Sequence, residues 1–370
     1  MTAAMLSPFP LDAGTAPLRK PVRAWLFGVA ALVIIMVGVG GATRLTGSGL
    51  SITEWQPIVG TIPPLTEWDW QQAFLKYQQI PQYQQANRGM SLEAFKSIFW
   101  WEWAHRNLGR LIGVAFLLPF LFFLATGSIS RDLGLKLAGI FGLGVVQGAA
   151  GWYMVASGLN DRVDVSQYRL ALHLGLAVLI LGALVWTALA LRQDGARAVG
   201  AGKTAVAAAA IMALVFVQIL LGALVAGLRA GLAYNTWPLM DGRLIPAGLA
   251  AMEPWYLNLF ENALTVQFNH RLTAYALAVA VVWRAIVVMM RPSQQGERRS
   301  AVALALAVAV QIGLGIWTLL DQVPAPLGIA HQAMAALVFS LAVWHLTESW
   351  QAPPGAAKGP VTMAAMRTRP

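Results

Sequence analysis

Four of the five histidines in this 370-residue chain lie beside or inside long apolar runs, where an ionisable side chain is costly and marks a functional site. These four are His105, His173, His270 and His331. Zinc usually requires three or four ligands, and the chain has no cysteine and no HExxH pattern. A porphyrin requires only two axial ligands, which a helix bundle can supply from facing helices. The pattern therefore favours a porphyrin held between pairs of histidines.

Basic and small residues near the histidines suit the same ligand. Four arginines lie within one or two turns on the outer side and are candidates for binding or positioning the propionates: Arg106, Arg110, Arg169 and Arg271. Several glycines on the helices would leave room for a flat ring, although for any one of them ordinary close helix packing is the better interpretation: Gly109, Gly148, Gly151, Gly175, Gly313 and Gly315. We interpret the fifth histidine, His345, as a hydrogen-bonded packing residue.

The composition places these residues in a membrane. Hydrophobic residues make up 58% of the chain and charged residues only 11%, and the mean hydropathy is +0.61, which is too apolar for a water-soluble domain. A helix needs about 20 apolar residues to cross the hydrocarbon core. The stretches that meet this requirement are 24–43, 107–127, 135–155, 171–192, 204–227, 267–290, 301–320 and 329–347. The sequence therefore predicts an all-α integral membrane protein with eight transmembrane helices.

An internal repeat divides these helices into two sets of four. The segment GLSITEW matches GLAYNTW, and WEWAHRNLG matches VQFNHRLTA, so that His105 aligns with His270. The segments around His173 and His331 match as well. We therefore predict two pseudo-symmetric four-helix bundles. The predicted ligand pairs are His105 with His173 and His270 with His331.

One ionisable group distinguishes the two halves. Glu102 stands three residues before His105, and the aligned position in the second half is Gln267. Residues three apart share a helix face, so the Glu102 carboxylate lies beside any ring that His105 holds. This asymmetry nominates the first half as the reactive one. The alternative is that Glu102 is an outer-surface charge that pairs with Arg106 four residues later.

The basic residues predict the orientation of the chain. Their bias places both termini in the cytoplasm, and it explains the net charge of +10 by topology and attraction to anionic lipids rather than to nucleic acid. The aromatic-rich segment TEWDWQQAF predicts short helices at the headgroup level that cover the first half. The predicted organisation is a cytoplasmic tail (1–23), an N-terminal half (24–192) with a long outer loop (45–104), a cytoplasmic linker (193–203), a C-terminal half (204–347) and a disordered cytoplasmic tail (348–370).

Several segments together resemble the haem A synthase family over roughly residues 25–347: GGATRLTGSGLSITEW, EWAHRNLGRLIG, RLALHLGLA, GLAYNTWPLMDGR and FNHRLTAY. Members of that family are membrane enzymes that oxidise the C8 methyl group of haem O to a formyl group, which gives the haem A of cytochrome c oxidase. Some members carry a cysteine pair in the first outer loop. This chain has no cysteine, so it resembles the cysteine-free branch, and a thiol–disulfide step is excluded.

The resemblance implies a role for each candidate residue. His270 and His331 would hold the iron of one permanent haem b cofactor, and His105 and His173 would be the ligands of the substrate haem O. Glu102 would be catalytic. We expect successive oxidations in which iron and porphyrin carry the redox burden. Glu102 would either accept a proton or stabilise positive charge that develops on the macrocycle.

Two other functional classes fit part of the pattern. A diheme b-type electron-transfer cytochrome explains the four histidines, but it gives no reason for Glu102 and Gln267 to differ. A haem transporter is consistent with repeated membrane halves, but the spans lack the broken helices that are expected at a midplane substrate site.

The resemblance also implies partners, and the first residues favour a location. Haem O synthase and cytochrome oxidase assembly proteins are the expected partners besides haem O and membrane lipid, and no nucleic acid is expected. The first residues show no Arg- and Ser-rich amphipathic presequence, which favours the bacterial plasma membrane over the mitochondrial inner membrane. We expect a multi-pass protein with its haem sites toward the outer face.

Overall fold

The computed structural model describes residues 19–160, 162–192 and 203–350. Within these residues, eight helices are long and apolar enough to cross a membrane, which confirms the predicted all-α membrane fold. They are α1 (Arg19–Leu45), α3 (Leu92–Ala125), α4 (Arg131–Leu159), α5 (Gln167–Ala190), α6 (Lys203–Gly227), α8 (Ala263–Met290), α9 (Gln295–Leu320) and α10 (Ala325–Ser349). Nearly all of the predicted linker and tails lies outside the described residues, at 1–18, 193–202 and 351–370.

The helices extend beyond their predicted apolar runs, and α3 does so most. It begins at Leu92, whereas the predicted span begins at 107 and the predicted loop ends at 104. The Ser91 hydroxyl caps this helix by accepting a hydrogen bond from the backbone N–H of Ala94 at 3.2 Å. Phe95 and Phe99 are buried under the preceding loop, so helix continues through residues that hydropathy alone assigns to the loop.

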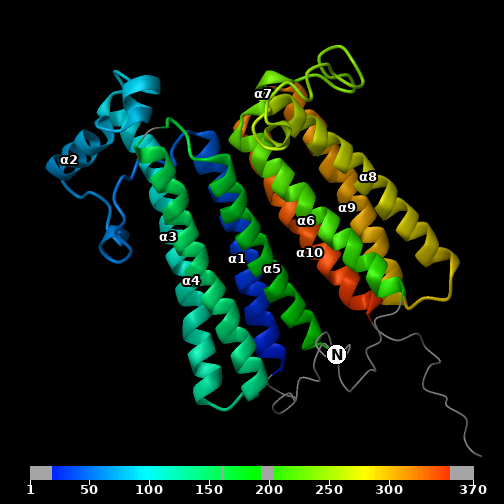
Figure 1. Cartoon of the computed structure of the whole chain (residues 1–370). Helices are drawn as coiled ribbons and strands as arrows, with labels where there is room; N and C mark the ends of the chain where they lie inside the picture. The colour runs from blue at the N-terminus through cyan, green and yellow to red at the C-terminus, as the bar shows by residue number, and fades with distance from the viewer. Residues whose placement is uncertain (1–18, 161, 193–202, 351–370) are drawn as a thin grey trace, which may run out of the picture.

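Each half of the chain forms a ring of four helices. In the first half α1 and α4 each pack against both α3 and α5, and in the second half α6 and α9 each pack against both α8 and α10. Helices α3 and α5 therefore occupy opposite corners of the first ring, and α8 and α10 occupy opposite corners of the second. The two rings stand side by side (Figure 1), joined by α1 and α5 on one side and α6 and α10 on the other. A symmetry relation between them stays a prediction.

Close packing holds the two halves together. Buried residues such as Leu26, Leu181 and Val343 form one continuous core through both rings. Gly182 of α5 lies so near α10 that a Cβ added to it would stand 2.8 Å from Cε1 of Phe339. Lipid tails are as apolar as leucine, so such close approach, rather than exclusion of water, supplies most of the attraction between membrane helices.

One end of the bundle carries the long connections, and we call it the loop end. There the predicted short helices of the first loop are confirmed as α2 (Glu67–Gln78), flanked by the single turns η3 (Val59–Thr61) and η4 (Gln82–Ala86). Thr66 and Asp69 form a reciprocal capping box at the start of α2. The buried Tyr77 hydroxyl donates to Gln82 and accepts from Asn87, and burial raises the pKa of this phenol.

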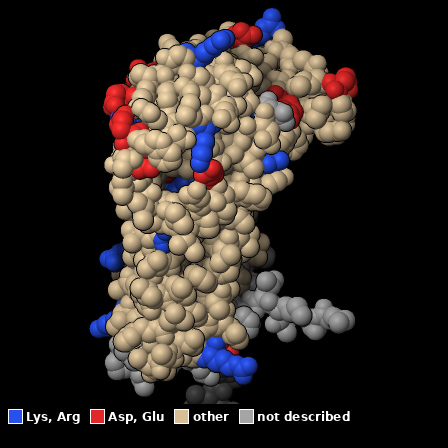
Figure 2. All heavy atoms as spheres, turned by 90° about the vertical axis from the view of Figure 1, so that its left-hand side faces the viewer, with Lys and Arg blue, Asp and Glu red and all other residues tan. Residues whose placement is uncertain are grey.

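The loop covers the first half. A second apolar cluster, which includes Trp70 of α2, Phe95 of α3 and Val165, lies at the loop end of that half. On the face shown in Figure 2, Asp and Glu gather mainly over the loop end, and most of the surface below is uncharged. The second half has a shorter connection with α7 (Ala230–Ala233) and the turn η5 (Trp255–Leu259).

Ion pairs tie the halves together at the loop end. Asp164, between α4 and α5, accepts from Arg44 of α1 at 3.1 Å and from Arg229, after α6, at 2.9 Å. Glu261, which precedes α8, accepts from Gln167 and Tyr168 of α5 at 2.9 and 2.6 Å. These contacts fix the two helix rings relative to each other at the loop end.

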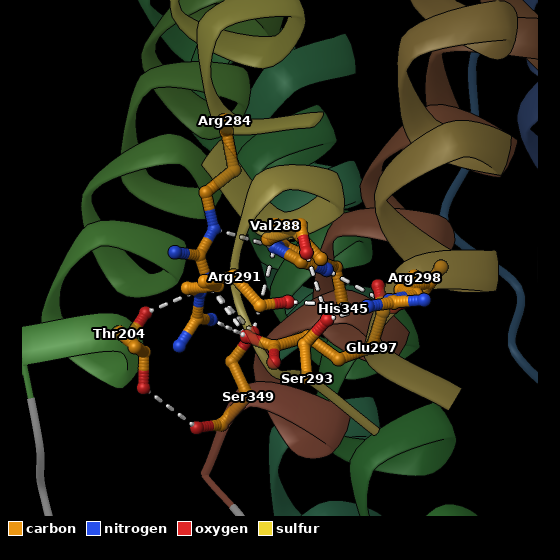
Figure 3. Close-up of polar contacts among 10 residues, drawn as sticks. Thr204, Arg284, Val288, Arg291, Ser293, Glu297, Arg298, His345 and Ser349 are labelled. Carbon is orange, nitrogen blue, oxygen red and sulfur yellow. Dashed lines mark hydrogen bonds and ion pairs between the residues drawn. The ribbon is translucent and has the colours of Figure 1, made fainter. Parts of the chain in front are cut away.

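A cluster of buried polar side chains closes the opposite end of the second half (Figure 3). Arg284 donates from Nε to Nε2 of His345 at 3.0 Å and from Nη2 to Glu297 at 2.9 Å. The other ring nitrogen of His345 lies 2.9 Å from the Ser300 hydroxyl, and Arg291 makes a second ion pair with Glu297. Both nitrogens of His345 are thus occupied within the protein, in agreement with the predicted packing role.

Removing one member of this cluster is expected to destabilise the protein. Arg284→Ala would remove the buried guanidinium that donates to both His345 and Glu297, which costs about 3 kcal/mol and lowers the melting temperature by roughly 4 °C. Thermal unfolding in detergent, followed by size-exclusion chromatography, measures this. The control is Arg299→Ala, because Arg299 is exposed and lies on α9, the helix that also carries Glu297 and Ser300. Equal melting temperatures for the two variants would show that the cluster does not stabilise the fold.

Candidate functional site

The four predicted histidines lie near the loop end. Each is on a different helix, and the two helices that carry a pair stand at opposite corners of one four-helix ring. His105 is on α3 and His173 on α5, and His270 is on α8 and His331 on α10. Because each pair comes from opposite corners, the two imidazoles of a pair flank the centre of one ring. This placement suits a flat ligand bound between two axial nitrogens. The predicted pairs thus fall in one half each.

Each histidine ring lies against a glycine of a neighbouring helix. A Cβ at that position would stand 3.1 Å or less from a ring atom, closer than real Cβ atoms usually come. The pairs are Gly40 of α1 with His105, Gly151 of α4 with His173, Gly222 of α6 with His270 and Gly315 of α9 with His331. Two of these glycines, Gly151 and Gly315, belong to the predicted set, and for both the close approach is to the histidine itself.

Three glutamines accompany the histidines, and the sequence interpretation missed them. Gln147, Gln218 and Gln311 each donate from Nε2 to the backbone carbonyl of the histidine opposite, at 3.0 Å in every case. Each amide also lies 3.1–3.5 Å from a nitrogen of the same imidazole. The signal was present, because each glutamine precedes by four residues the glycine that faces the histidine.

Glu102 is buried and accepts four hydrogen bonds. Only 2% of its surface is exposed. One carboxylate oxygen accepts from the Ser51 hydroxyl at 2.8 Å and from the Ile52 backbone N–H at 2.7 Å. The other accepts from Nε and Nη2 of Arg106 at 3.0 and 2.6 Å. The pairing with Arg106 that the alternative interpretation expected is therefore present within α3, but Glu102 is buried rather than an outer-surface charge, and its bonds to Ser51 and Ile52 link α3 to the loop.

The corresponding contacts in the second half use an amide. Gln267 donates from Nε2 to the carbonyl of Tyr234 at 2.9 Å, and Arg271 donates to the same oxygen at 3.0 Å. Tyr234 aligns with Ile52 in the repeat, and the residue that aligns with Ser51 is Ala233. The second half thus makes the same attachment of loop to helix without a carboxylate and without the hydroxyl that binds it.

The four predicted arginines all lie at the loop end and donate to backbone carbonyls. Arg106 bonds to Ile52 and Glu54, and Arg110 bonds to Gln56 and Pro57. Arg169 bonds to the carbonyl of Tyr153 and stacks on its ring, with Cζ 3.7 Å from the ring centroid. Arg271 bonds to Tyr234. Since a guanidinium has five N–H groups, donors remain for a propionate, and that role stays a prediction.

The residues present fit a porphyrin. Among the described residues, Nδ1 of His173 and Nδ1 of His331 are buried without a hydrogen-bond partner, so neither ring is satisfied by the protein alone. Each imidazole lies against a glycine, and a larger residue at that position would have a side chain that displaces the imidazole. Arginines stand at the loop end of both rings. The set therefore offers two sites, each with two imidazoles and a basic rim.

Comparison with known proteins decides the family. A family model described as "Cytochrome oxidase assembly protein" matches residues 23–343. The chain belongs to this family. Among similar proteins, the "Heme A synthase" of Parvibaculum lavamentivorans is 58% identical over 322 residues, which cover 87% of this chain and 92% of that protein. The "Heme A synthase" of Rhodopseudomonas palustris strain BisA53 is 54% identical over 365 residues, which cover 97% and 99%.

A third relative carries the same name. The "Heme A synthase" of Nitrosospira multiformis is 54% identical over 330 residues, which cover 88% of this chain and 93% of that protein. The match to the family model extends over both helix rings of the structure and over all four histidines. The predicted family resemblance is confirmed.

Replacing Gly315, the glycine that lies against His331, with alanine is expected to impair haem binding. In Gly315→Ala the new Cβ would lie 2.8 Å from Cε1 of His331, so the ring must move. We expect the haem content of the purified protein, measured by the pyridine haemochrome method, to fall by roughly one haem per chain. Gly313→Ala is the matched control, because a Cβ there meets no atom within 4 Å. Unchanged haem content in Gly315→Ala would argue against His331 as a ligand.

Proposed function

We propose that this protein is a haem A synthase, an oxidoreductase that converts the methyl group of haem O to the formyl group of haem A. The observation that carries the proposal is the presence of two histidine pairs in separate helix rings, with a buried carboxylate, Glu102, three residues before His105 where the second ring has Gln267. Relatives that are 54–58% identical over most of the chain and named heme A synthase support the same activity.

The two rings have different tasks in this proposal. The second ring holds a permanent haem b through His270 and His331, and its surroundings offer no carboxylate at the position of Gln267. The first ring binds haem O between His105 and His173. When bound, the iron porphyrins supply the oxidation and electron transfer. The protein holds, orients and electrostatically stabilises the reacting porphyrin.

Glu102 contributes a fixed negative charge in the first ring. Its oxygens already accept four hydrogen bonds from Ser51, Ile52 and Arg106, so a free lone pair for a proton is not at hand. We therefore favour stabilisation of positive charge on the macrocycle over proton transfer. The same bonds fix the carboxylate at the start of the loop, which keeps the charge in place during the reaction.

We also propose surroundings for the substrate. We place the loop end at the outer face of the bacterial plasma membrane, where Arg106, Arg110, Arg169 and Arg271 would meet the haem propionates. The apolar tail of haem O would then lie among membrane-spanning helices. Haem O synthase and cytochrome oxidase assembly proteins are the proposed partners for delivery and release, because haem O is poorly soluble in water.

The decisive test analyses the haems that copurify with the protein. The chain is expressed in a host that makes haem O but no haem A, and the extracted haems are separated by chromatography. We expect haem A and residual haem O beside haem b. His105→Ala should retain haem b alone, which would assign the substrate to the first ring. Two haem b groups per chain and no haem A would instead indicate an electron-transfer cytochrome, and saturable haem uptake into vesicles without product would indicate a transporter.

Loss of the Glu102 charge is expected to reduce turnover. Glu102→Gln keeps the size of the side chain but removes the negative charge, and a lost electrostatic contact of this kind lowers the rate by about a hundredfold. Haem A formed per haem O added measures the effect. Glu54→Gln is the matched control, because Glu54 is an exposed carboxylate of the same loop that pairs with Lys76. Full turnover of Glu102→Gln with both haems bound would refute the role.

A further inference from the structure

Three of the four histidines are tied to a neighbouring helix by a glutamine. The tie joins α4 to α5 at His173, α6 to α8 at His270 and α9 to α10 at His331, and in each case the amide N–H reaches the histidine carbonyl at 3.0 Å. The amide also stands beside the imidazole, so it restrains both the turn of helix and the ring. Such secondary contacts fix the orientation of a ligating histidine.

The fourth histidine has no such tie. Gln218 lies four residues before Gly222, and the residue four before Gly40 is Met36. A thioether cannot donate a hydrogen bond. Within the described part of the chain, no side chain of another helix bonds to the ring or the carbonyl of His105.

Met36 stands at the position of α1 that corresponds to Gln218 of α6. Its terminal Cε lies 3.4 Å from where a Cβ of Gly109 would be, so the side chain reaches α3 one turn beyond His105. Methionine and glutamine are similar in length, so the difference is one of hydrogen bonding rather than of filled space. Two other polar contacts join α1 to α3, and neither reaches His105. The Trp25 indole N–H donates to the Ala115 carbonyl at 2.8 Å, and the Thr43 hydroxyl lies 3.4 Å from the Trp101 carbonyl but bonds more closely, at 2.9 Å, within its own helix.

We propose that Met36 makes His105 an exchangeable ligand of a porphyrin bound in the first ring. Met36 is a positioning residue that acts by leaving the His105 imidazole without the hydrogen bond by which Gln218 holds His270 in place. A histidine that is held less firmly would let a substrate porphyrin enter and the product depart. The permanent haem of the second ring needs the opposite property. This inference rests on the proposed function only for the identity of the porphyrin in the first ring.

Exchanging the two side chains tests the proposal, and the first arm uses haem b alone. The full chain and Gln218→Met are purified from a host that makes neither haem O nor haem A. Carbon monoxide binding to the reduced haem and haem transfer to apomyoglobin are then measured. The native chain should exclude carbon monoxide. Gln218→Met should bind it and release haem b about tenfold faster, the usual effect of one lost hydrogen bond.

The second arm adds haem O to the native chain, to Met36→Gln and to Met36→Leu. We expect Met36→Gln to release haem O about tenfold more slowly than the native chain and to bind less carbon monoxide in the first ring. Met36→Leu retains an apolar side chain and should bind carbon monoxide as the native protein does. A slow release in Met36→Leu as well would assign the effect to packing and overturn the proposal.

The outcomes separate this inference from the proposed function. If Gln218→Met still excludes carbon monoxide, or if Met36→Gln releases haem O at the native rate, the glutamine tie does not set ligand exchange. Haem A formation by the native chain together with either result would leave the enzyme activity intact and remove only the inference. No haem A from the native chain, with both exchanges behaving as expected, would remove the activity and keep the inference.

Discussion

The contact between each histidine and a glycine of the next helix is the constraint on which the two sites depend. An imidazole near the centre of a helix ring needs space that a neighbouring Cβ would fill, and glycine provides it on α1, α4, α6 and α9. The same absence of a side chain allows helices in lipid to approach closely. Packing and ligand placement therefore rely on one set of residues, and the histidines come from opposite corners of each ring.

The loop end adds polar contacts that differ between the rings. In the first ring the start of the long loop is bonded to Glu102 and Arg106, and in the second the corresponding backbone is bonded to Gln267 and Arg271. Replacing a carboxylate with an amide reverses the required partner, because a carboxylate accepts from N–H and O–H groups whereas the amide nitrogen donates to a carbonyl. The serine that donates to the carboxylate, Ser51, aligns with Ala233 in the second half, where the carboxylate is absent from the aligned position. The two rings share an attachment and differ in charge.

The far end of the second half is built differently. There Arg284, His345 and Glu297 satisfy one another in a buried cluster, and the histidine has no nitrogen left for a ligand. The histidines near the loop end lack this closure, and two of them keep a buried nitrogen without a partner among the described residues. Similar side chains in one bundle thus satisfy one another at one end and remain available to a ligand at the other.

Composition and apolar length determined the eight helices, and the repeat and the family resemblance nominated the histidines, because these properties are linear in the sequence. Helix ends were less predictable. The start of α3 depends on a cap at Ser91 and on aromatic packing under α2. Neither contact can be read from the mean hydropathy of the segment. The sequence did predict short helices that cover the first half, but the contacts by which α2 packs there, such as Trp70 against Phe99, required the tertiary structure.

The contacts around the histidines were decided only by tertiary structure. The sequence placed Gln147 and Gln311 in matching repeat segments, but which residue each amide would reach depends on how two helices cross. The difference between Met36 and Gln218 likewise has no meaning until both are seen against the helices that carry His105 and His270. A residue's type is fixed by the sequence, whereas its partner is fixed by the geometry of packing, and the chemistry of a ligand depends on both.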